Sequence, residues 1–328
     1  MSDEIEVLNG KASFFGVVDP AWHRLGTILK SPPTVREAIT LAGLDWQVRL
    51  QPLHMRYDGE EMSVPAYATV RDSDRSVLGV VGPTYKPLQN QDAFDFFQPW
   101  LDQGLADLET AGSLRHGKRV WVLAKMKSAN LEIVKGDEIA KYILLSNGHD
   151  GTLAVRTGFT GIRVVCANTM AMAHGDKSSK LLRVRHSKNT VKALDGIREI
   201  MNLAEQAFEA TADQFRFLAR KDVNTDDLKS FVKQVFKPKV LEGGPLVTEA
   251  DEEDCERLVG RIIPLFENGR GNALPGVAGT MWAAYNAVNE YLAYERGRSD
   301  DGRLHSLWFG DSARLNQRAL QVAMAMTG

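Results

Sequence analysis

Three residues near the middle of the chain have side chains suited to nucleophilic catalysis: Cys166, His149 and Asp150. A cysteine becomes a nucleophile when its thiolate is favoured and a base lies within hydrogen-bond reach. His149 would be that base if the segments 141–146 and 162–167 form paired strands. Cysteine is also among the residues most often buried, and Cys166 ends an apolar run. We therefore expect Cys166 to be a buried strand residue, and the catalytic set is the alternative.

Other familiar chemistry is missing from the sequence. The seven histidines include no HxxxH pair and the two cysteines have no CxxC spacing, so we expect no metal site. The glycine-rich stretch 267–276 lacks the Gly-Lys-Ser/Thr ending of a phosphate-binding loop, so we expect a linker there and no nucleotide cofactor. The dipeptides around His149 and Asp150 are typical of a turn.

A basic segment points to a different kind of site. Residues 151–200 hold nine basic residues against three acidic ones, although the whole chain has a net charge of −2. In "LLRVRH" an extended backbone places Arg183 and Arg185 on one face, about 6–7 Å apart, close to the phosphate spacing of an extended nucleic-acid strand. One alternative is a solvated sheet edge that resists aggregation, and another is that the acidic stretch "VTEADEEDCE" (247–256) offsets this charge within one chain or between copies. The expected phosphate contacts are Arg156, Arg163, Lys177, Lys180, Arg183, Arg185 and Lys188.

Aromatic residues near this segment have two possible roles. Tyr85, Trp121 and Phe159 could stack on bases, but aromatic side chains in such apolar runs more often belong to the core.

The elements that must position these residues change character along the chain. Strands rich in Val, Ile and Leu are expected at 66–72, 77–82, 119–126, 141–146, 152–159 and 162–167, and helices at 31–43 and 90–104. After residue 188 the apolar spacing becomes helical, with further helices at 225–236, 249–266, 279–295 and 312–327. We predict an α+β fold with an antiparallel β-rich domain over residues 1–187 and a mainly helical region over 188–328.

Length and composition favour a globular protein. The 328 residues are 44% hydrophobic and 25% charged, and no segment has the uninterrupted apolar length of a membrane span. The acidic start "MSDEIEVLNG" has no signal-peptide layout. We therefore expect a cytoplasmic protein of a bacterial host cell, without a membrane partner.

Several blocks of the sequence resemble the "phage/plasmid-like protein" family, a domain of unknown function. They are "PAWHRLGT" (20–27), "LGVVGPTYKPLQNQDAF" (78–94), "ETAGSLRHGKRVWVLAKM" (109–126), "LLSNGHDGTLAVRTGFTGIRVVCANT" (144–169), "TMWAAYNAVNEYLAYER" (280–296) and "LWFGDSARLNQRAL" (307–320). The resemblance implies a mobile-element setting. The order of β-rich core, basic segment and long helix also looks like the phage single-strand annealing proteins of the Red-beta type, which form rings or filaments and hold DNA in a basic groove.

The leading hypothesis is a non-enzymatic, oligomeric protein that binds single-stranded DNA and promotes annealing in mobile-element recombination. One alternative is a nucleic-acid-processing enzyme that uses His149, Asp150 and Cys166. Another is a protein that binds a host partner through its helical half.

Overall fold

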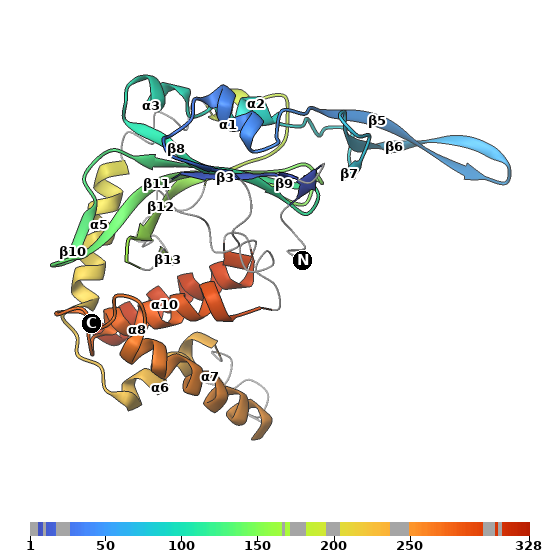
Figure 1. Cartoon of the computed structure of the whole chain (residues 1–328). Coiled ribbons are helices and arrows are strands. Elements are labelled where there is room, and N and C mark those ends of the chain that lie inside the picture. The colour runs from blue at the N-terminus through green and yellow to red at the C-terminus, as the bar shows by residue number, and fades with distance from the viewer. Residues whose placement is uncertain are drawn as a thin grey trace. The chain divides into compact units, whose positions relative to one another are not determined.

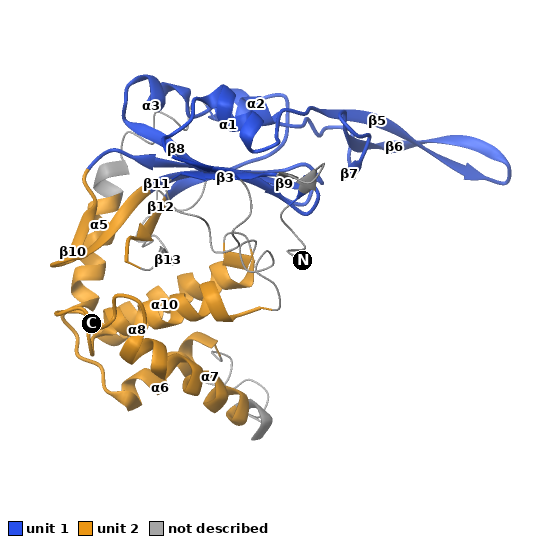
Figure 2. Ribbon diagram, viewed as in Figure 1, with its two compact units in different colours: residues 1–128, 142–159, 180–203 blue, residues 129–141, 160–179, 204–328 orange. Residues whose placement is uncertain are grey.

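The computed structural model describes residues 6–8, 11–17, 27–165, 168–170, 182–194, 204–236, 249–297, 306–307 and 310–328. These residues mix sheets and helices, which confirms the α+β class. They form two compact units, and each unit is built from three segments of the chain (Figure 2). Unit 1 contains residues 1–128, 142–159 and 180–203, and unit 2 contains residues 129–141, 160–179 and 204–328. The sequence predicts two consecutive domains, 1–187 and 188–328, whereas the segments of these two units alternate along the chain.

The strands belong mainly to the first half of the chain, as expected (Figure 1). They are β1 (Val7–Leu8), β2 (Lys11–Ala12), β3 (Phe14–Val17), β4 (Thr27–Leu29), β5 (Val48–Tyr57), β6 (Glu60–Arg71), β7 (Val77–Val81), β8 (Ala106–Leu114), β9 (Arg119–Met126), β10 (Leu131–Val134), β11 (Asp137–Gly148), β12 (Val155–Arg163), β13 (Asn168–Met170) and β14 (Leu182–Val184).

The helices are short before residue 188 and long after it. They are α1 (Val35–Leu41), α2 (Asn90–Asp95), α3 (Gln98–Asp102), α5 (Ala204–Leu218), α6 (Thr225–Phe236), α7 (Glu249–Asn268), α8 (Met281–Glu290), the π-helical turn η3 (Tyr291–Glu295) and α10 (Asp311–Thr327). The sequence prediction for α6 matches at both ends.

Among the described residues, nine strands form one sheet, in the order β13-β12-β11-β9-β8-β3-β4, with β10 paired to β11 and β14 paired to β12. Strand β3 pairs with β4 in parallel, whereas the pairs β3–β8, β8–β9, β9–β11, β10–β11, β12–β13 and β12–β14 are antiparallel. A second sheet has the order β5-β6-β7.

The single strand β12 (Val155–Arg163) spans parts of two expected strands, 152–159 and 162–167, of which residues 166 and 167 lie outside the described residues. Thr160 and Gly161 continue the extended backbone rather than interrupt it. Because β12 is one continuous strand, its alternate residues share a face along its whole length.

The core of unit 1 lies between its part of the large sheet and helices α1, α2 and α3, which cover one face of that sheet (Figure 1). Phe94 of α2 and Phe97, which precedes α3, pack in one cluster with Val122 and Leu145 from the sheet. Helix α1 begins at a capping box, in which Thr34 and Glu37 each satisfy a backbone N–H of the other.

The core of unit 2 is formed by α5, α6, α7, α8 and α10. Trp282 of α8 lies against Phe215 of α5, with ring centroids 4.7 Å apart, and against Tyr285. Thr280 caps α8 through its side-chain oxygen, which accepts a hydrogen bond from the backbone N–H of Ala283.

Candidate nucleic-acid interface

Two arginines of the expected binding set lie directly opposite one another in unit 1. Strand β14 pairs antiparallel with β12, and the register places Arg156 beside Arg183. Directly opposite residues of neighbouring strands project from the same face, with Cβ atoms about 4.5–5.5 Å apart. The sheet therefore holds two guanidinium groups together on one face.

The alternation of each strand explains why these arginines point away from the core. In β12, Val155 and Thr157 are completely buried, so Arg156 between them faces the other side and is half-buried. Val184 of β14 packs against the core cluster, whereas Arg183 of β14 and Arg185, which follows the strand, are exposed. Over the described side chains 183–186, the two arginines are exposed and Val184 and His186 are partly buried, which agrees with the expected alternation.

The surroundings of this pair are positively charged. Burial, then Arg183 and then Arg119 lower the pKa of Arg156 below its usual value. The segments 151–165 and 182–194 contain no aspartate or glutamate. Asp150, which precedes them, is engaged by Arg119 through a short hydrogen bond. Within these two described segments, the charged side chains near Arg156 and Arg183 are therefore all basic.

The basic side chains continue beyond β14. Lys188 is exposed and lies just before a helical turn at residues 190–194, which Thr190 and Ser187 hold through hydrogen bonds. Lys177 and Lys180 lie outside the described residues. The described part of the expected set on this surface is therefore Arg156, Arg183, Arg185 and Lys188.

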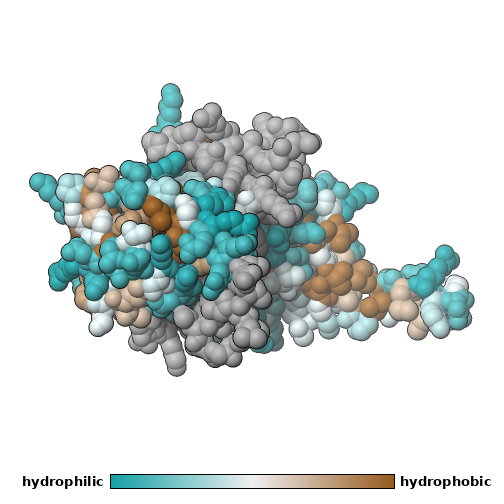
Figure 3. Space-filling view, turned by 90° about the horizontal axis from the view of Figure 1, so that it is seen from below, coloured by the Kyte–Doolittle hydropathy of each residue, from teal (hydrophilic) through white to brown (hydrophobic). Residues whose placement is uncertain are grey.

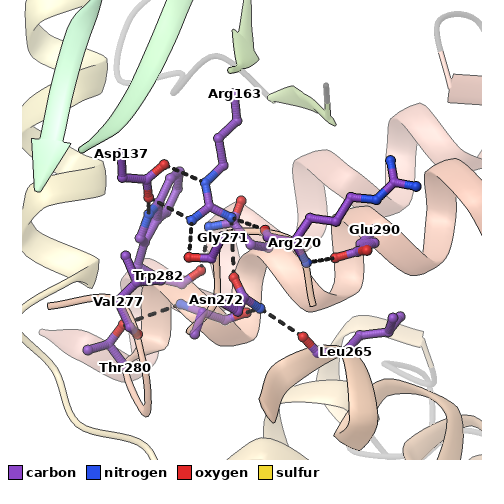
Figure 4. A network of polar contacts seen from close by, with 12 residues as sticks. Asp137, Arg163, Leu265, Arg270, Gly271, Asn272, Val277, Thr280, Trp282 and Glu290 are labelled. Carbon is purple, nitrogen blue, oxygen red and sulfur yellow. Dashed lines mark hydrogen bonds and ion pairs between the residues drawn. The ribbon is translucent and has the colours of Figure 1, made fainter. Parts of the chain in front are cut away.

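Arg163 has a different position and is removed from the expected phosphate contacts. Its side chain is completely buried in unit 2, where it forms a two-pronged ion pair with the equally buried Asp137. Nε and Nη2 of Arg163 donate to the two carboxylate oxygens, each at 2.7 Å (Figure 4). A guanidinium has five N–H donors. The other three face the carbonyl oxygens of Arg270 and Gly271 and the amide oxygen of Asn272, so none is left for a phosphate.

The rest of this network joins several elements of unit 2. Trp282 donates its indole N–H to Asp137 and lies beneath the Arg163 guanidinium. The amide nitrogen of Asn272 donates to the carbonyl oxygens of Leu265 in α7 and Ala283 in α8 (Figure 4). The network therefore ties strands β11 and β12 to the loop between α7 and α8.

The stretch 267–276 was expected to be a linker, but Asn272 within it is completely buried. Gly271 is needed beside it, because its φ is +75° and a Cβ there would lie 2.4 Å from Val165 Cγ2 and 3.1 Å from Arg163 Nη2. The sequence signal for a tightly packed turn was its high glycine content, which is equally typical of linkers.

The alternative catalytic residues do not form an accessible set. His149 is completely buried, and its Nε2 lies 2.9 Å from Asn90 Oδ1. The amide nitrogen of Asn90 donates to the carbonyl oxygen of Leu44, so Oδ1 of Asn90 is the acceptor and Nε2 of His149 is the donor. Burial, followed by His186, lowers the pKa of His149 to about 3. A base buried in this way does not meet a substrate.

Cys166 lies outside the described residues. Strands β11 and β12 are neighbours, as the catalytic hypothesis requires. The backbone N–H of Val164 donates to the carbonyl oxygen of Glu138, the second residue of β11, whereas His149 follows the last residue of that strand.

The aromatic residues considered for base stacking are mostly part of the core. Tyr85 is buried, donates its hydroxyl to the carbonyl oxygen of Gly148 and stacks on His186. Trp121 is buried beside Phe14. Phe159 is partly buried and packs against the core cluster of unit 1.

In the described residues no group of three or more His, Cys, Asp or Glu side chains could hold a metal ion. Within that same part of the chain, every helix is too short or too polar to span a lipid bilayer.

Comparison with known proteins gives a family. The family model described as "Domain of unknown function (DUF932)" matches residues 77–308. The curated proteins and the solved structures gave no match. The mobile-element setting and the likeness to annealing proteins of the Red-beta type remain predictions. Since the matched region covers more than half of the 328 residues, this chain belongs to the DUF932 family.

Proposed function

We propose that this protein binds single-stranded nucleic acid through its phosphates, assembles with further copies of itself, and promotes annealing during recombination of a phage or plasmid in a bacterial cytoplasm. The observation that carries the proposal is the cross-strand pair of Arg156 and Arg183, continued by the exposed Arg185 and Lys188.

Like charges directly opposite each other on a sheet repel, and an anion bound beside them would relieve this repulsion, so the pairing of Arg156 with Arg183 favours anion binding on this face. Arginine forms bidentate contacts with phosphate oxygens. Arg183 and Arg185 lie two residues apart and both are exposed, which suits successive phosphates of an extended strand. Binding of this kind is largely independent of base sequence.

The test is a fluorescence-anisotropy titration of a labelled oligothymidylate at several salt concentrations. For single strands, the logarithm of the binding constant falls with the logarithm of salt by about 0.7 per phosphate contact. The double variant Arg183→Gln/Arg185→Gln should therefore bind more weakly, with a slope smaller by about 1.4. Both side chains are exposed, so the fold should be retained.

The matched control is Arg257→Gln/Arg314→Gln. It removes the same charge from two exposed helical positions of unit 2, each paired with an aspartate three residues earlier. This control should keep the wild-type affinity and slope. Equal losses in both double variants would reduce the effect to net charge, and an unchanged slope in Arg183→Gln/Arg185→Gln would refute the proposed contacts.

A further inference from the structure

The outer part of the β5–β6 hairpin is an arm that extends from unit 1 (Figure 1). Its twelve residues are 53–64, and none of them is buried. The chain reverses at Asp58 and Gly59, which have positive φ angles of 48° and 89°, as a tight hairpin turn requires. A two-stranded ribbon that stands alone in water is only marginally stable. The arm therefore needs a further surface to pack against.

The two faces of the arm differ in polarity. The register pairs Leu53 with Val64 and Met55 with Met62, and Tyr57 follows on the same face. The opposite face holds the pairs His54 with Ser63 and Arg56 with Glu61. One face of the arm is thus almost entirely apolar. This face is nevertheless exposed to solvent, and Tyr57 on it is 62% exposed.

The apolar face continues along the base of the same sheet. On β5 this face consists of the alternate residues 49, 51, 53, 55 and 57. The register shifts at a bulge, whose two extra residues, Pro65 and Ala66, lie on β6. Gln51 is in register with Ala68, which pairs with Val80, and Arg49 is in register with Val70, which pairs with Val77. Val77 and Val80 are 60% and 59% exposed. We call this surface the outer face of the β5-β6-β7 sheet.

Exposed large hydrophobic side chains are concentrated on the outer face. Of the eleven large hydrophobic residues that are exposed in the described part of the chain, five lie on it. They are Met55, Tyr57, Met62, Val77 and Val80. Figure 3 shows hydrophobic surface over the base of the hairpin. Tyrosine and methionine are enriched at protein interfaces, and a contiguous apolar patch of this kind marks a contact site.

Charge selects the kind of partner. The arm carries three carboxylates, Asp58, Glu60 and Glu61, against one arginine, Arg56, and this excess of negative charge would repel nucleic acid and an anionic membrane. On the outer face itself Glu60 lies opposite Tyr57 at the tip, and Arg49 lies at the base, 3.9 Å from Asp72. Because the side chain of Arg49 is 67% exposed and that of Asp72 only 28%, the outer face presents a carboxylate at one end, a guanidinium at the other and apolar side chains between them, and it complements a copy of itself turned end for end.

We propose that the outer face binds the outer face of a second copy of this chain about a two-fold axis near Leu53. Antiparallel superposition of two β5 strands about that residue brings position 57 of one copy over position 49 of the other. Tyr57 and Glu60 at one tip then cover Arg49 and Val70 at the other base, and Met55 and Met62 cover Gln51 and Ala68. A two-fold contact of this type uses the same surface of both copies and closes on itself.

The proposed contact rests on the self-assembly in the proposed function and specifies the surface through which two copies associate. The first experiment is sedimentation velocity of the full chain without nucleic acid, over a range of concentrations. The wild type should have a mass of two copies or an even multiple. The variant Met55→Lys/Met62→Glu removes the apolar centre but keeps a favourable cross-strand pair in the hairpin. It should raise the dissociation constant about 30-fold or more, which is the effect of losing an interface hot spot.

The matched control is His54→Lys/Ser63→Glu, which places the same charges at the neighbouring register pair on the opposite face of the arm. It should associate like the wild type. A monomeric wild type, or a Met55→Lys/Met62→Glu variant that associates as tightly as the control, would overturn the proposal.

A charge exchange tests the antiparallel arrangement. Arg49→Glu and Glu60→Arg should each weaken association, because each places like charges together in both symmetric contacts. The combination Arg49→Glu/Glu60→Arg restores opposite charges across the contact and should recover association relative to either single variant, short of the wild-type dissociation constant because Asp72 lies beside position 49. Failure of that recovery would refute the arrangement about Leu53. These results are separate from the oligothymidylate titration of Arg183→Gln/Arg185→Gln, so the contact and the proposed nucleic-acid binding can fail independently.

Discussion

Arg163 and Asp137 face each other at 2.7 Å through two parallel hydrogen bonds, and both side chains are completely buried. Arg156, on the same strand β12, lies instead beside another arginine on a half-buried face. One strand thus holds a cation that stabilises the fold and a cation that we assign to an anionic partner.

Loss of the Asp137 charge should strongly destabilise the protein. Asp137→Asn leaves Arg163 charged and buried without its counter-ion, which typically costs about 3–5 kcal/mol. Urea denaturation followed by the helical circular-dichroism signal would measure this. Asp213→Asn, which removes an exposed carboxylate paired with Arg216, should change the free energy of unfolding by less than about 1 kcal/mol. Similar effects of the two changes would contradict the assigned role of the buried pair.

His149 should make the free energy of unfolding depend on pH. Its pKa is about 3 in the folded protein and near 6.5 when unfolded, so between these values the unfolded state binds the additional proton. Stability should fall as the pH drops from about 6.5 towards 3, by up to about 1.4 kcal/mol per pH unit from this residue. His149→Gln retains an N–H donor for Asn90 and should flatten the profile. Parallel profiles of wild type and variant would contradict a neutral, buried His149.

Gly79 should tolerate no side chain. A Cβ at this position would lie 2.5 Å from Asp150 Cα and 2.8 Å from Asp150 O, which are backbone atoms of the turn that Arg119 holds. Gly79→Ala should lower the free energy of unfolding by about 1–3 kcal/mol. Gly82→Ala, three residues on, meets nothing within 4 Å and should be close to neutral. Thermal denaturation of the two variants gives the comparison, and equal melting temperatures would argue against this close approach.

Arg183 should affect stability and binding in opposite directions. Arg183→Gln removes a like charge opposite Arg156 and should raise the free energy of unfolding by about 0.2–1 kcal/mol. The same variant should bind oligothymidylate more weakly, with a salt slope smaller by about 0.7. Urea denaturation and anisotropy titration on one preparation measure both quantities. If stability and affinity fell together, Arg183 would have a structural role instead.

Local patterns predicted much of this fold. Val- and Ile-rich runs bounded by turn residues located β7 and β9, and helical spacing located α6 and α10, because these elements bury one face and leave the other in water. The β5–β6 hairpin was not predicted beyond residues 66–72. Its outer strands alternate apolar and polar residues, but their apolar face is exposed to solvent and is not packed against the core. No feature of the neighbouring sequence therefore indicates these strands.

The sequence by itself determined that basic residues cluster around β12 and β14 and that Arg183 and Arg185 share an exposed face, because strand alternation is a local property of the backbone. Tertiary structure decided which arginines are available. Because β12 is one continuous strand, Arg163 lies at an alternate position in line with the buried residues Val155 and Thr157. A guanidinium can be buried there only where a carboxylate and carbonyl groups accept hydrogen bonds from all its donors. Asp137 and the 270–272 turn supply these from 26 and more than 100 residues away, a distance in sequence that no local pattern can register.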